Sequence, residues 1–148
     1  MATHLGALLH RESVQLDARA DDRLDAVRQA GAALVAAGAV EESYVDSMLR
    51  REKTVSTYVG EGIALPHGTI SGKGAVLEDA LIVLRFPDGV DWNGETVTVV
   101  IGIAAAEGRH IALLARLADI LLDETHASRL RRAETVDDVL AVLGTESS

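Results

Sequence analysis

The run TVTVVIGIA at residues 96–104 constrains the fold more than any other segment of the chain. It is almost entirely apolar and rich in β-branched residues, a pattern typical of a strand buried on both faces. A second run, ALIVLRF at residues 80–86, is interrupted only by Arg85 and predicts another buried strand. The first run is the more continuous, so we expect it to lie at the centre of a sheet.

Turn-forming residues separate these two runs. The sequence PDG at residues 87–89 has turn chemistry and predicts that the strand at 80–86 ends there. An Asn-Gly pair at residues 93–94 is typical of a hairpin-like turn. The segment between the two strands is therefore expected to consist of turns.

Helical patterns fill the first third of the chain. A helix is predicted to begin near Asp21 or Asp22, with Asp25 placed to complete an acidic capping box, and Gly38 is a stop signal. A second helix is predicted over residues 41–53, acidic at its start and basic at its end, as the helix dipole favours. Both helices carry apolar residues at three- and four-residue spacing, which predicts that each packs one face on the sheet.

Further elements are predicted at both ends of the chain. A helix with a wide apolar face begins around His110, and a short helix follows at residues 124–132. Thr135 with Asp138 forms a capping box for a final helix. Near the N-terminus, alternating apolar residues predict a short strand at 13–16.

Strands and helices are interspersed along a chain of 148 residues, without internal repeats or a linker. This pattern predicts a single α/β domain over residues 1–148, with a mixed sheet and helices packed on it. Hydrophobic residues make up 48% of the chain and only 3% are aromatic, so the core is expected to consist of small aliphatic side chains.

Charge and composition exclude several functions. The formal net charge of −9 argues against nucleic acid or an anionic membrane surface as a partner, but suits docking on a basic patch of another protein. The absence of cysteine excludes disulfides, thiolate metal sites and cysteine nucleophiles. No apolar run approaches the roughly 20 residues of a membrane helix, and the start lacks the pattern of a signal peptide, so we expect a cytoplasmic protein without direct membrane insertion.

Two of the five histidines lie at predicted strand ends beside glycine. His67 follows a short apolar strand and Pro66, and His110 stands at the start of a helix. Ligands of open α/β sheets bind outside the carboxyl ends of strands, and a helix start favours an anion. The other three, His4, His10 and His126, are expected to be surface residues.

Several chemistries remain open for this pair. The two histidines are either unrelated turn residues that bond to nearby carbonyls, or they act together. Together they would hold a metal, with Glu61 or Asp119 as third ligand, although no His/Cys cluster or HExxH motif is present. Phosphate-loop and GxSxG motifs are also missing. The remaining hypothesis is a histidine that acts as nucleophile or acid/base on a small anionic group, with phosphoryl as the favoured group.

Two charged residues near His67 are further candidates. Arg51 ends the second predicted helix and could reach an oxyanion near His67, although the dipole argument alone favours a role at the helix end. Glu61 lies between Gly60 and Gly62, where it would either steer Arg51 or accept a proton from an imidazole, or be a solvated loop carboxylate.

At this point the motifs support a family resemblance. The matching segments are TYVGEGIALPHGT at 57–69, VIGIAAAEGRHI at 100–111, REK at 51–53, AVRQAGAALVAAGAV at 26–40, YVDSMLRREK at 44–53 and TVDDVLAVL at 135–143. With them the chain resembles a phosphotransferase-system enzyme IIA of the mannitol/fructose class, most of all its mannitol-type branch. The PHGT segment together with the GIAA…H segment is a specific pair, and the resemblance covers nearly the whole chain.

The resemblance implies a mixed five-stranded sheet flanked by helices on both faces. It also implies that His67 receives a phosphoryl group from the phosphocarrier protein HPr and passes it to a cysteine of enzyme IIB. His110 matches the second active-site histidine of the family, which is expected to bond the phosphoryl group or to orient His67. Arg51 and Glu61 fall on positions that surround the phosphohistidine in mannitol-type domains.

The same resemblance implies the atoms involved. Nε2 of His67 is expected to carry the phosphoryl group, with Nδ1–H bonded to a backbone carbonyl. The donors and positive charge for the phosphoryl group are expected from Gly68, the helix start at Arg109, His110 and Arg51. Positioning and electrostatics suffice for such transfer, so no cofactor and no metal are expected.

A second type of enzyme IIA remains an alternative. Nitrogen-type regulators signal by their phosphorylation state and transport no sugar, whereas the GIAA…H and REK segments favour the mannitol type. The chain lacks the cysteine of an enzyme IIB and the membrane helices of an enzyme IIC, so it is expected to work with separate partners.

Overall fold

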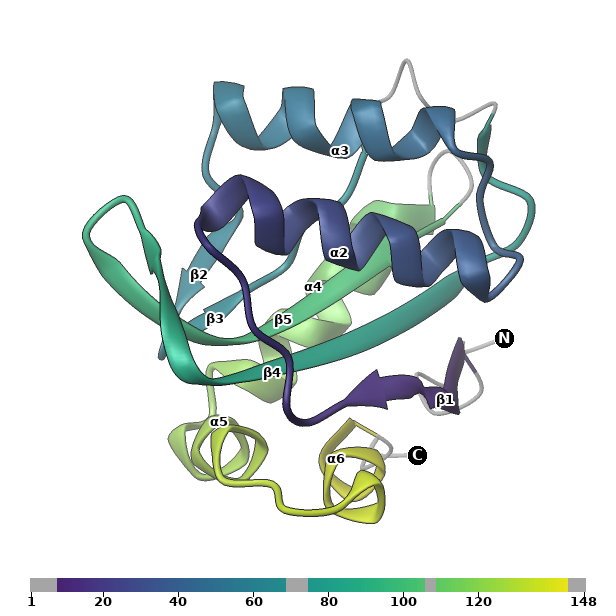
Figure 1. Ribbon diagram of the computed structural model, residues 1–148. Helices are drawn as coiled ribbons and strands as arrows, with labels where there is room; N and C mark the ends of the chain where they lie inside the picture. Colours follow the sequence, from purple (N-terminus) through teal and green to yellow (C-terminus); the bar gives the residue numbers. More distant parts are fainter. Residues whose placement is uncertain (1–7, 69–74, 106–108, 144–148) are drawn as a thin grey trace.

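A mixed sheet of five strands runs through the middle of the molecule (Figure 1). The computed structural model describes residues 8–68, 75–105 and 109–143. The strands lie in the order β1-β4-β5-β3-β2. Their bounds are Leu9–Gln15 for β1, Tyr58–Gly60 for β2, Ile63–Ala64 for β3, Ala80–Trp92 for β4 and Glu95–Ala104 for β5. The apolar run at 96–104 therefore forms the middle strand, as predicted.

Helices cover both faces of this sheet. On one face lie α2 (Arg23–Ala36) and α3 (Ser43–Thr54), which Figure 1 shows side by side above the strands. The other face carries α4 (Arg109–Leu121), α5 (Glu124–Arg131) and α6 (Val136–Leu143). The expectation of one domain with a mixed sheet between two helical layers is confirmed.

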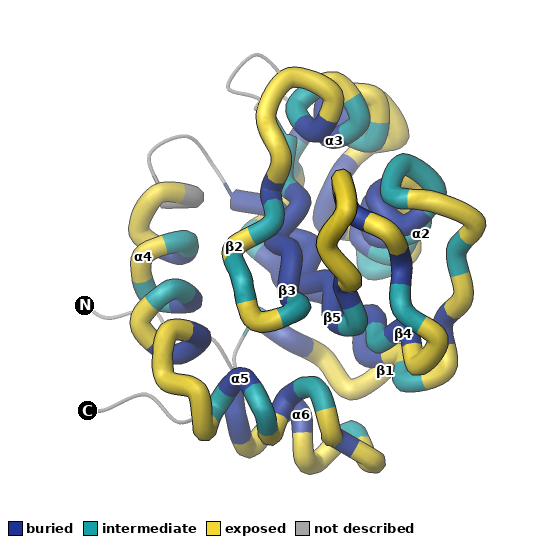
Figure 2. Tube along the Cα trace, turned by 90° about the vertical axis from the view of Figure 1, so that its left-hand side faces the viewer, coloured by how far each residue is buried: buried dark blue, intermediate teal, exposed yellow. Residues whose placement is uncertain are grey.

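Each face has its own apolar core: the core on the side of α4, α5 and α6 is aliphatic, as expected, whereas the core on the side of α2 and α3 also contains Tyr44, Phe86 and Trp92. Ile101 and Ile103 of β5 pack toward α4, α5 and α6, whereas Val100 and Ala104 pack toward α2 and α3. This alternation follows from the two-residue period of a strand. Figure 2 shows the middle strands as buried, while the helices keep exposed outer sides.

Local chemistry at the helix ends explains where α2 begins and ends. The Asp22 carboxylate accepts a hydrogen bond from the N–H of Asp25 at 2.8 Å, and the Asp25 carboxylate accepts one from Asp21 at 2.9 Å. After the helix, Gly38 takes a φ of +77° and its N–H bonds to the carbonyl of Val35. Glycine adopts this left-handed conformation without steric cost, so α2 ends where the sequence predicts.

The predicted capping box of α6 is also present. Thr135 Oγ1 accepts a hydrogen bond from the N–H of Asp138 at 3.1 Å, and the Asp138 carboxylate accepts one from the N–H of Thr135 at 3.2 Å. The N–H of Glu134 donates to the same carboxylate at 3.0 Å, and this bond is the largest cause of the lowered pKa of Asp138. These bonds fix the start of the helix that closes the second core.

One predicted boundary is wrong. The strand at 80–86 does not end at residues 87–89, because β4 continues to Trp92. Its pairing with β5 shifts register between Arg85 and Val90, where extra residues bulge out. Proline is tolerated at a bulge because no ladder hydrogen bond is required of it there, so turn chemistry at 87–89 interrupts the ladder without ending the strand.

The predicted turn at residues 93–94 is confirmed. Trp92 pairs with Glu95, which leaves a two-residue loop, and Asn93 and Gly94 both have positive φ, at +56° and +96°. These are the backbone conformations of the tight hairpin turn that Asn-Gly favours. The resulting β4–β5 hairpin forms the longest ladder of the sheet and aligns β5 with its parallel neighbour β3.

Candidate functional site

The site lies where two parallel neighbours, β3 and β5, both end. Ile63 and Ala64 of β3 pair with Val99 and Val100 of β5, so the carboxyl ends of the two strands point the same way. His67 comes just after β3 and α4 begins just after β5. Ligands of α/β proteins bind at such an edge, as the sequence predicted for these two junctions.

The backbone of His67 is fixed to the end of β5. His67 forms an isolated parallel bridge with Ile103, and the N–H of Ile103 donates to the carbonyl of Pro66 at 3.0 Å. The ring of Pro66 restricts its own φ, which stiffens the segment before His67 further. The imidazole is therefore carried on a short, rigid extension of the sheet.

A backbone contact determines which nitrogen of His67 carries the proton. Nδ1 lies 2.9 Å from the carbonyl oxygen of Leu65. A carbonyl oxygen only accepts hydrogen bonds, so Nδ1 is the protonated nitrogen, and the lone pair of the neutral ring lies on Nε2. This geometry agrees with the expectation of an Nδ1–H bonded to a backbone carbonyl.

Tyr44 of α3 holds the turn after His67. Its hydroxyl donates to the carbonyl of Ile103 at 2.9 Å and accepts from the N–H of Gly68 at 2.9 Å. Burial raises the pKa of the Tyr44 phenol, and the hydrogen bond from Gly68 opposes this shift in part. One side chain thus joins α3, the segment after β3 and the end of β5.

This contact corrects one expectation. Gly68 was predicted to offer its N–H to a phosphoryl group, but the structure shows that N–H bonded to the Tyr44 hydroxyl. The helical spacing predicts Tyr44 as a buried residue of α3, which is confirmed. Its role at the site was missed, and the available signal was chemical: a buried phenol needs a polar partner.

Gly68 is required by close packing against α3. A Cβ atom at this position would lie 2.5 Å from Cε1 of Tyr44 and 2.9 Å from Oγ of Ser47. Such distances are shorter than van der Waals contact, so a larger residue would push the segment away from the helix. The glycine therefore lets His67 lie close to α3.

Arg51 lies on the same side of α3 as these contacts. Tyr44 and Arg51 are seven residues apart, two turns or about 10 Å along the axis, and so share a helix face. Ser47, which packs on Gly68, is one turn before Arg51 on that face. The Arg51 guanidinium donates to the carbonyl of Val55 at 2.8 Å, the helix-end role that the dipole argument favours. Its predicted role toward an oxyanion stays a prediction.

Glu61 occupies a strained turn between β2 and β3. Its φ is +56°, in the left-handed region that residues with a Cβ seldom adopt. Arg131 of α5 donates to the Glu61 carbonyl at 2.7 Å, and its guanidinium lies 3.5 Å from the carboxylate. Backbone strain at a non-glycine residue costs folding free energy, and such residues cluster at functional sites, so Glu61 is a candidate for function. The contact of Glu61 in the structure is with Arg131, and its predicted role beside His67 stays a prediction.

His110 lies in the first turn of α4, where free backbone N–H groups favour an anion. The topology therefore brings its backbone to the edge where His67 lies. The side chains of Arg109 and His110 lie outside the described part of the structure, as do residues 69–74 and 106–108.

Across residues 8–68, 75–105 and 109–143, no group of three or more histidine, aspartate or glutamate side chains is arranged to hold a metal ion. No helix in that part of the chain is long and apolar enough to cross a membrane.

Comparison with known proteins adds independent information. A family model described as "Phosphoenolpyruvate-dependent sugar phosphotransferase system, EIIA 2" matches residues 7–145. The chain is 37% identical over 138 residues to a mannitol-specific phosphotransferase enzyme IIA component of Staphylococcus aureus, covering 93% of this chain and 96% of that protein. It is 41% identical over 137 residues to the protein of the same name from Halalkalibacterium halodurans, covering 93% and 94%.

The fold matches a solved structure of similar size. The complex of enzyme IIA-Mtl and phosphorylated enzyme IIB-Mtl from Escherichia coli contains a chain that superposes with a TM-score of 0.87 at 39% identity. The match covers 94% of this chain and 100% of that one. Sequence and fold therefore point to the same relatives.

Proposed function

The chain belongs to the EIIA 2 family of the phosphoenolpyruvate-dependent sugar phosphotransferase system, and from this membership we propose that His67 is its phosphoryl-accepting residue. The protein is a phosphotransferase component of sugar uptake, and its relatives of known specificity include mannitol-specific components. The observation that carries the assignment of His67 is the 2.9 Å contact between its Nδ1 and the Leu65 carbonyl.

In the first half-reaction the Nε2 lone pair of neutral His67 attacks the phosphorus of phosphohistidine on HPr. The N–P bond on HPr breaks as the new Nε2–P bond forms, and the Nδ1–H stays on the Leu65 carbonyl. No proton has to leave His67, because the attacking nitrogen carries none. Transfer of this kind depends on positioning and on stabilisation of the phosphoryl charge.

In the second half-reaction a cysteine thiolate of enzyme IIB takes the phosphoryl group. A sulfur–phosphorus bond forms, the Nε2–P bond breaks, and the neutral imidazole of His67 is restored. The solved complex of an enzyme IIA with a phosphorylated enzyme IIB supports this partner. Mannitol-type uptake is the proposed pathway, and its location is the cytoplasm, where phosphoenolpyruvate and HPr are available.

Three further groups are proposed to stabilise the phosphoryl group. They are the N-terminal turn of α4, the His110 side chain that belongs to it, and Arg51. The N-terminal end of a helix offers free N–H donors and a positive dipole end, and a guanidinium offers a permanent positive charge. We further assign to Glu61 the orientation of these groups around His67.

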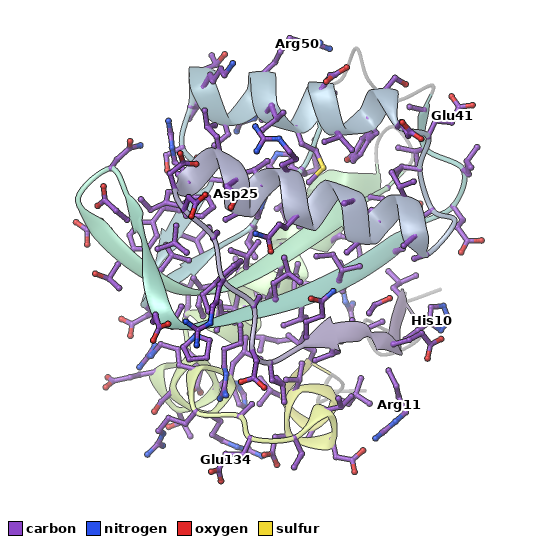
Figure 3. All side chains as sticks on the ribbon, in the orientation of Figure 1. His10, Arg11, Asp25, Glu41, Arg50 and Glu134 are labelled. Carbon is purple, nitrogen blue, oxygen red and sulfur yellow. The ribbon has the colours of Figure 1, made fainter. Side chains whose placement is uncertain are left out.

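Labelling by phosphoenolpyruvate tests the assignment of His67. The protein is incubated with enzyme I, HPr and labelled phosphoenolpyruvate, and we expect acid-labile, base-stable label. His67→Ala should abolish the label while leaving the fold intact, as circular dichroism would show. His10→Ala is the matched control, because His10 lies on β1 and points away from the molecule in Figure 3. Label that survives in His67→Ala would overturn the proposal.

Onward transfer separates a carrier from a nitrogen-type regulator. Labelled protein is mixed with mannitol-type and fructose-type enzyme IIB, and with IIB variants that have serine in place of the acceptor cysteine. A carrier loses its label only to the cysteine-containing forms. Label that is never passed to either IIB would favour regulation. His110→Ala should accept label but transfer it slowly.

A further inference from the structure

A buried carboxylate lies near the end of α3, the helix that also contacts the segment after His67. The side chain of Glu52, near the end of α3, has no exposed surface. Its Oε2 accepts hydrogen bonds from Nε1 of Trp92 at 2.9 Å and from the N–H of Thr57 at 3.2 Å. Its Oε1 accepts from the hydroxyl of Thr57, and the Arg23 guanidinium lies 3.8 Å from Oε2. A buried charge is stable only when it is paired and bonded in this way.

Glu52 fixes Thr57 by two separate hydrogen bonds. Thr57 offers its backbone N–H and its hydroxyl to the carboxylate, and Thr57 itself is buried. The neighbouring residues Val55 and Ser56 are exposed and carry the chain from α3 to β2. Glu52 therefore determines where this connection enters the sheet.

From Thr57 the contacts continue to His67. The carbonyl of Thr57 accepts a hydrogen bond from the N–H of Leu65 at 3.0 Å. The carbonyl of Leu65 in turn accepts from Nδ1 of His67 at 2.9 Å. A continuous series of hydrogen bonds thus runs from Glu52 through Thr57 and Leu65 to the imidazole.

We propose that Glu52 is a positioning residue that selects the Nδ1-protonated form of His67 by fixing Thr57 and hence the Leu65 carbonyl. The effect is transmitted through the position of the backbone and not through one conjugated series of hydrogen bonds, because the N–H and the C=O of each intervening residue belong to different peptide groups. If Thr57 shifts, the Leu65 N–H loses its hydrogen bond to the Thr57 carbonyl. The Leu65 carbonyl is then no longer held in line with Nδ1 of His67. The importance of this selection for phosphoryl transfer rests on the proposed function of His67.

The fixed proton position matters for attack at Nε2. A neutral histidine with its proton on Nε2 has no lone pair there to form a bond to phosphorus. Loss of the Leu65 contact would therefore populate a form that cannot react at Nε2 and would also loosen the ring. Small misplacements of reacting groups reduce rates by up to about 100-fold.

Two variants of the network and one control test the proposal. Glu52→Gln keeps the shape but has one acceptor oxygen instead of two. It therefore cannot accept all three hydrogen bonds, because Oε2 accepts from the Thr57 N–H and from Trp92 while Oε1 accepts from the Thr57 hydroxyl. Thr57→Val removes only the hydroxyl donor and is the milder change. Val139→Ala is the control for lost stability, because Val139 is buried in α6 on the other face of the sheet.

The readout is the position of the proton on His67 in the unphosphorylated protein. It is measured from the ring ¹⁵N chemical shifts, at a temperature where each variant is folded. Wild type and Val139→Ala should show the Nδ1–H form, whereas Glu52→Gln and Thr57→Val should show a mixture. Acceptance of label from phosphorylated HPr should fall by about 10- to 100-fold in Glu52→Gln.

The outcomes separate this proposal from the proposed function. An unchanged Nδ1–H form in both network variants would overturn the role of Glu52, whatever the labelling shows. If wild-type protein took no label on His67, the proposed function would fail, while the ¹⁵N shifts would still decide the positioning. A mixture in Val139→Ala as well would assign the effect to general loss of stability and would overturn the proposal.

Discussion

The hydroxyl group of Tyr44 accepts a 2.9 Å hydrogen bond from the backbone N–H of Gly68, the residue after His67. The same oxygen donates to Ile103, the residue that pairs with His67. Tyr44 therefore fixes two backbone positions beside the candidate nucleophile: the residue that follows it in the chain and the residue of β5 that pairs with it. The position of His67 depends on α3 as much as on the sheet.

Tyr44→Phe removes both contacts and keeps the ring. The Gly68 N–H and the Ile103 carbonyl lose a partner in a largely buried region, so we expect unfolding free energy to fall by about 1–3 kcal/mol. Urea unfolding measures this loss. Tyr58→Phe is the control, because the contact of that hydroxyl with the described residues is a long one, 3.4 Å from the N–H of Gly62. Equal losses in the two variants would contradict the role of Tyr44.

The titration of Tyr44 predicts a loss of stability in alkali. Burial raises its pKa above the ordinary value of 10.0, so the folded protein holds the phenolic proton more firmly than the unfolded chain. The resulting stability is fully present below pH 10 and is lost as the pH rises through the pKa of the folded state. The stability difference between wild type and Tyr44→Phe should be constant from pH 7 to about 9 and shrink above about 10. A difference that grows above pH 10 would show that the sign is wrong.

Arg51 and Arg50 make a matched pair on α3. Arg51 shares the face of Tyr44 and Ser47, whereas Arg50 is exposed and points away from the helix layer in Figure 3. Arg51→Ala should slow acceptance of label from phosphorylated HPr by about 100-fold, the usual effect of losing a donor to a developing anion. Its loss of stability should stay near 1 kcal/mol, since one hydrogen bond to Val55 is removed. Arg50→Ala should leave the rate unchanged, and equal rates in both variants would exclude a role for Arg51.

Glu61→Gly should separate stability from activity. Glycine relieves the strain of a φ of +56°, a gain of about 1 kcal/mol, against the small loss of a partly exposed ion pair with Arg131. The variant is therefore expected to be as stable as wild type or more so, but slower in accepting label. Asn93→Gly is the control, since Asn93 has the same φ of +56° in the other hairpin. A Glu61→Gly protein with the wild-type rate would assign Glu61 to the turn alone.

Features set by neighbouring residues could be predicted from the sequence. The Asp22 cap, the stop at Gly38 and the turn at residues 93–94 all depend on side chains within a few positions, and all three are confirmed. The central strand was predictable because an apolar run as long as 96–104 has few other places in an α/β domain.

Features set by distant partners could not be predicted in the same way. In the sequence, Glu52 lies between two basic residues, a pattern typical of a solvated helix end. Its burial could not be predicted, because its partners Arg23 and Trp92 are far away in the sequence. The hydroxyl of Tyr44 donates a hydrogen bond to the carbonyl of Ile103, 59 residues further along the chain. His67 could be identified because its chemistry depends on the adjacent Pro66 and Gly68.

The two outer strands limit association between copies of the protein. β2 is only three residues long and ends in Gly60, whose φ of +101° turns the chain away from an extended path. Pairing of β1 with β4 is interrupted between Leu9 and Val14, and exposed His10, Arg11 and Glu12 occupy that interval. Short, irregular or charged edges are poor templates for another strand. An apolar five-stranded sheet can therefore remain unassociated at the concentrations needed for repeated encounters with two different protein partners.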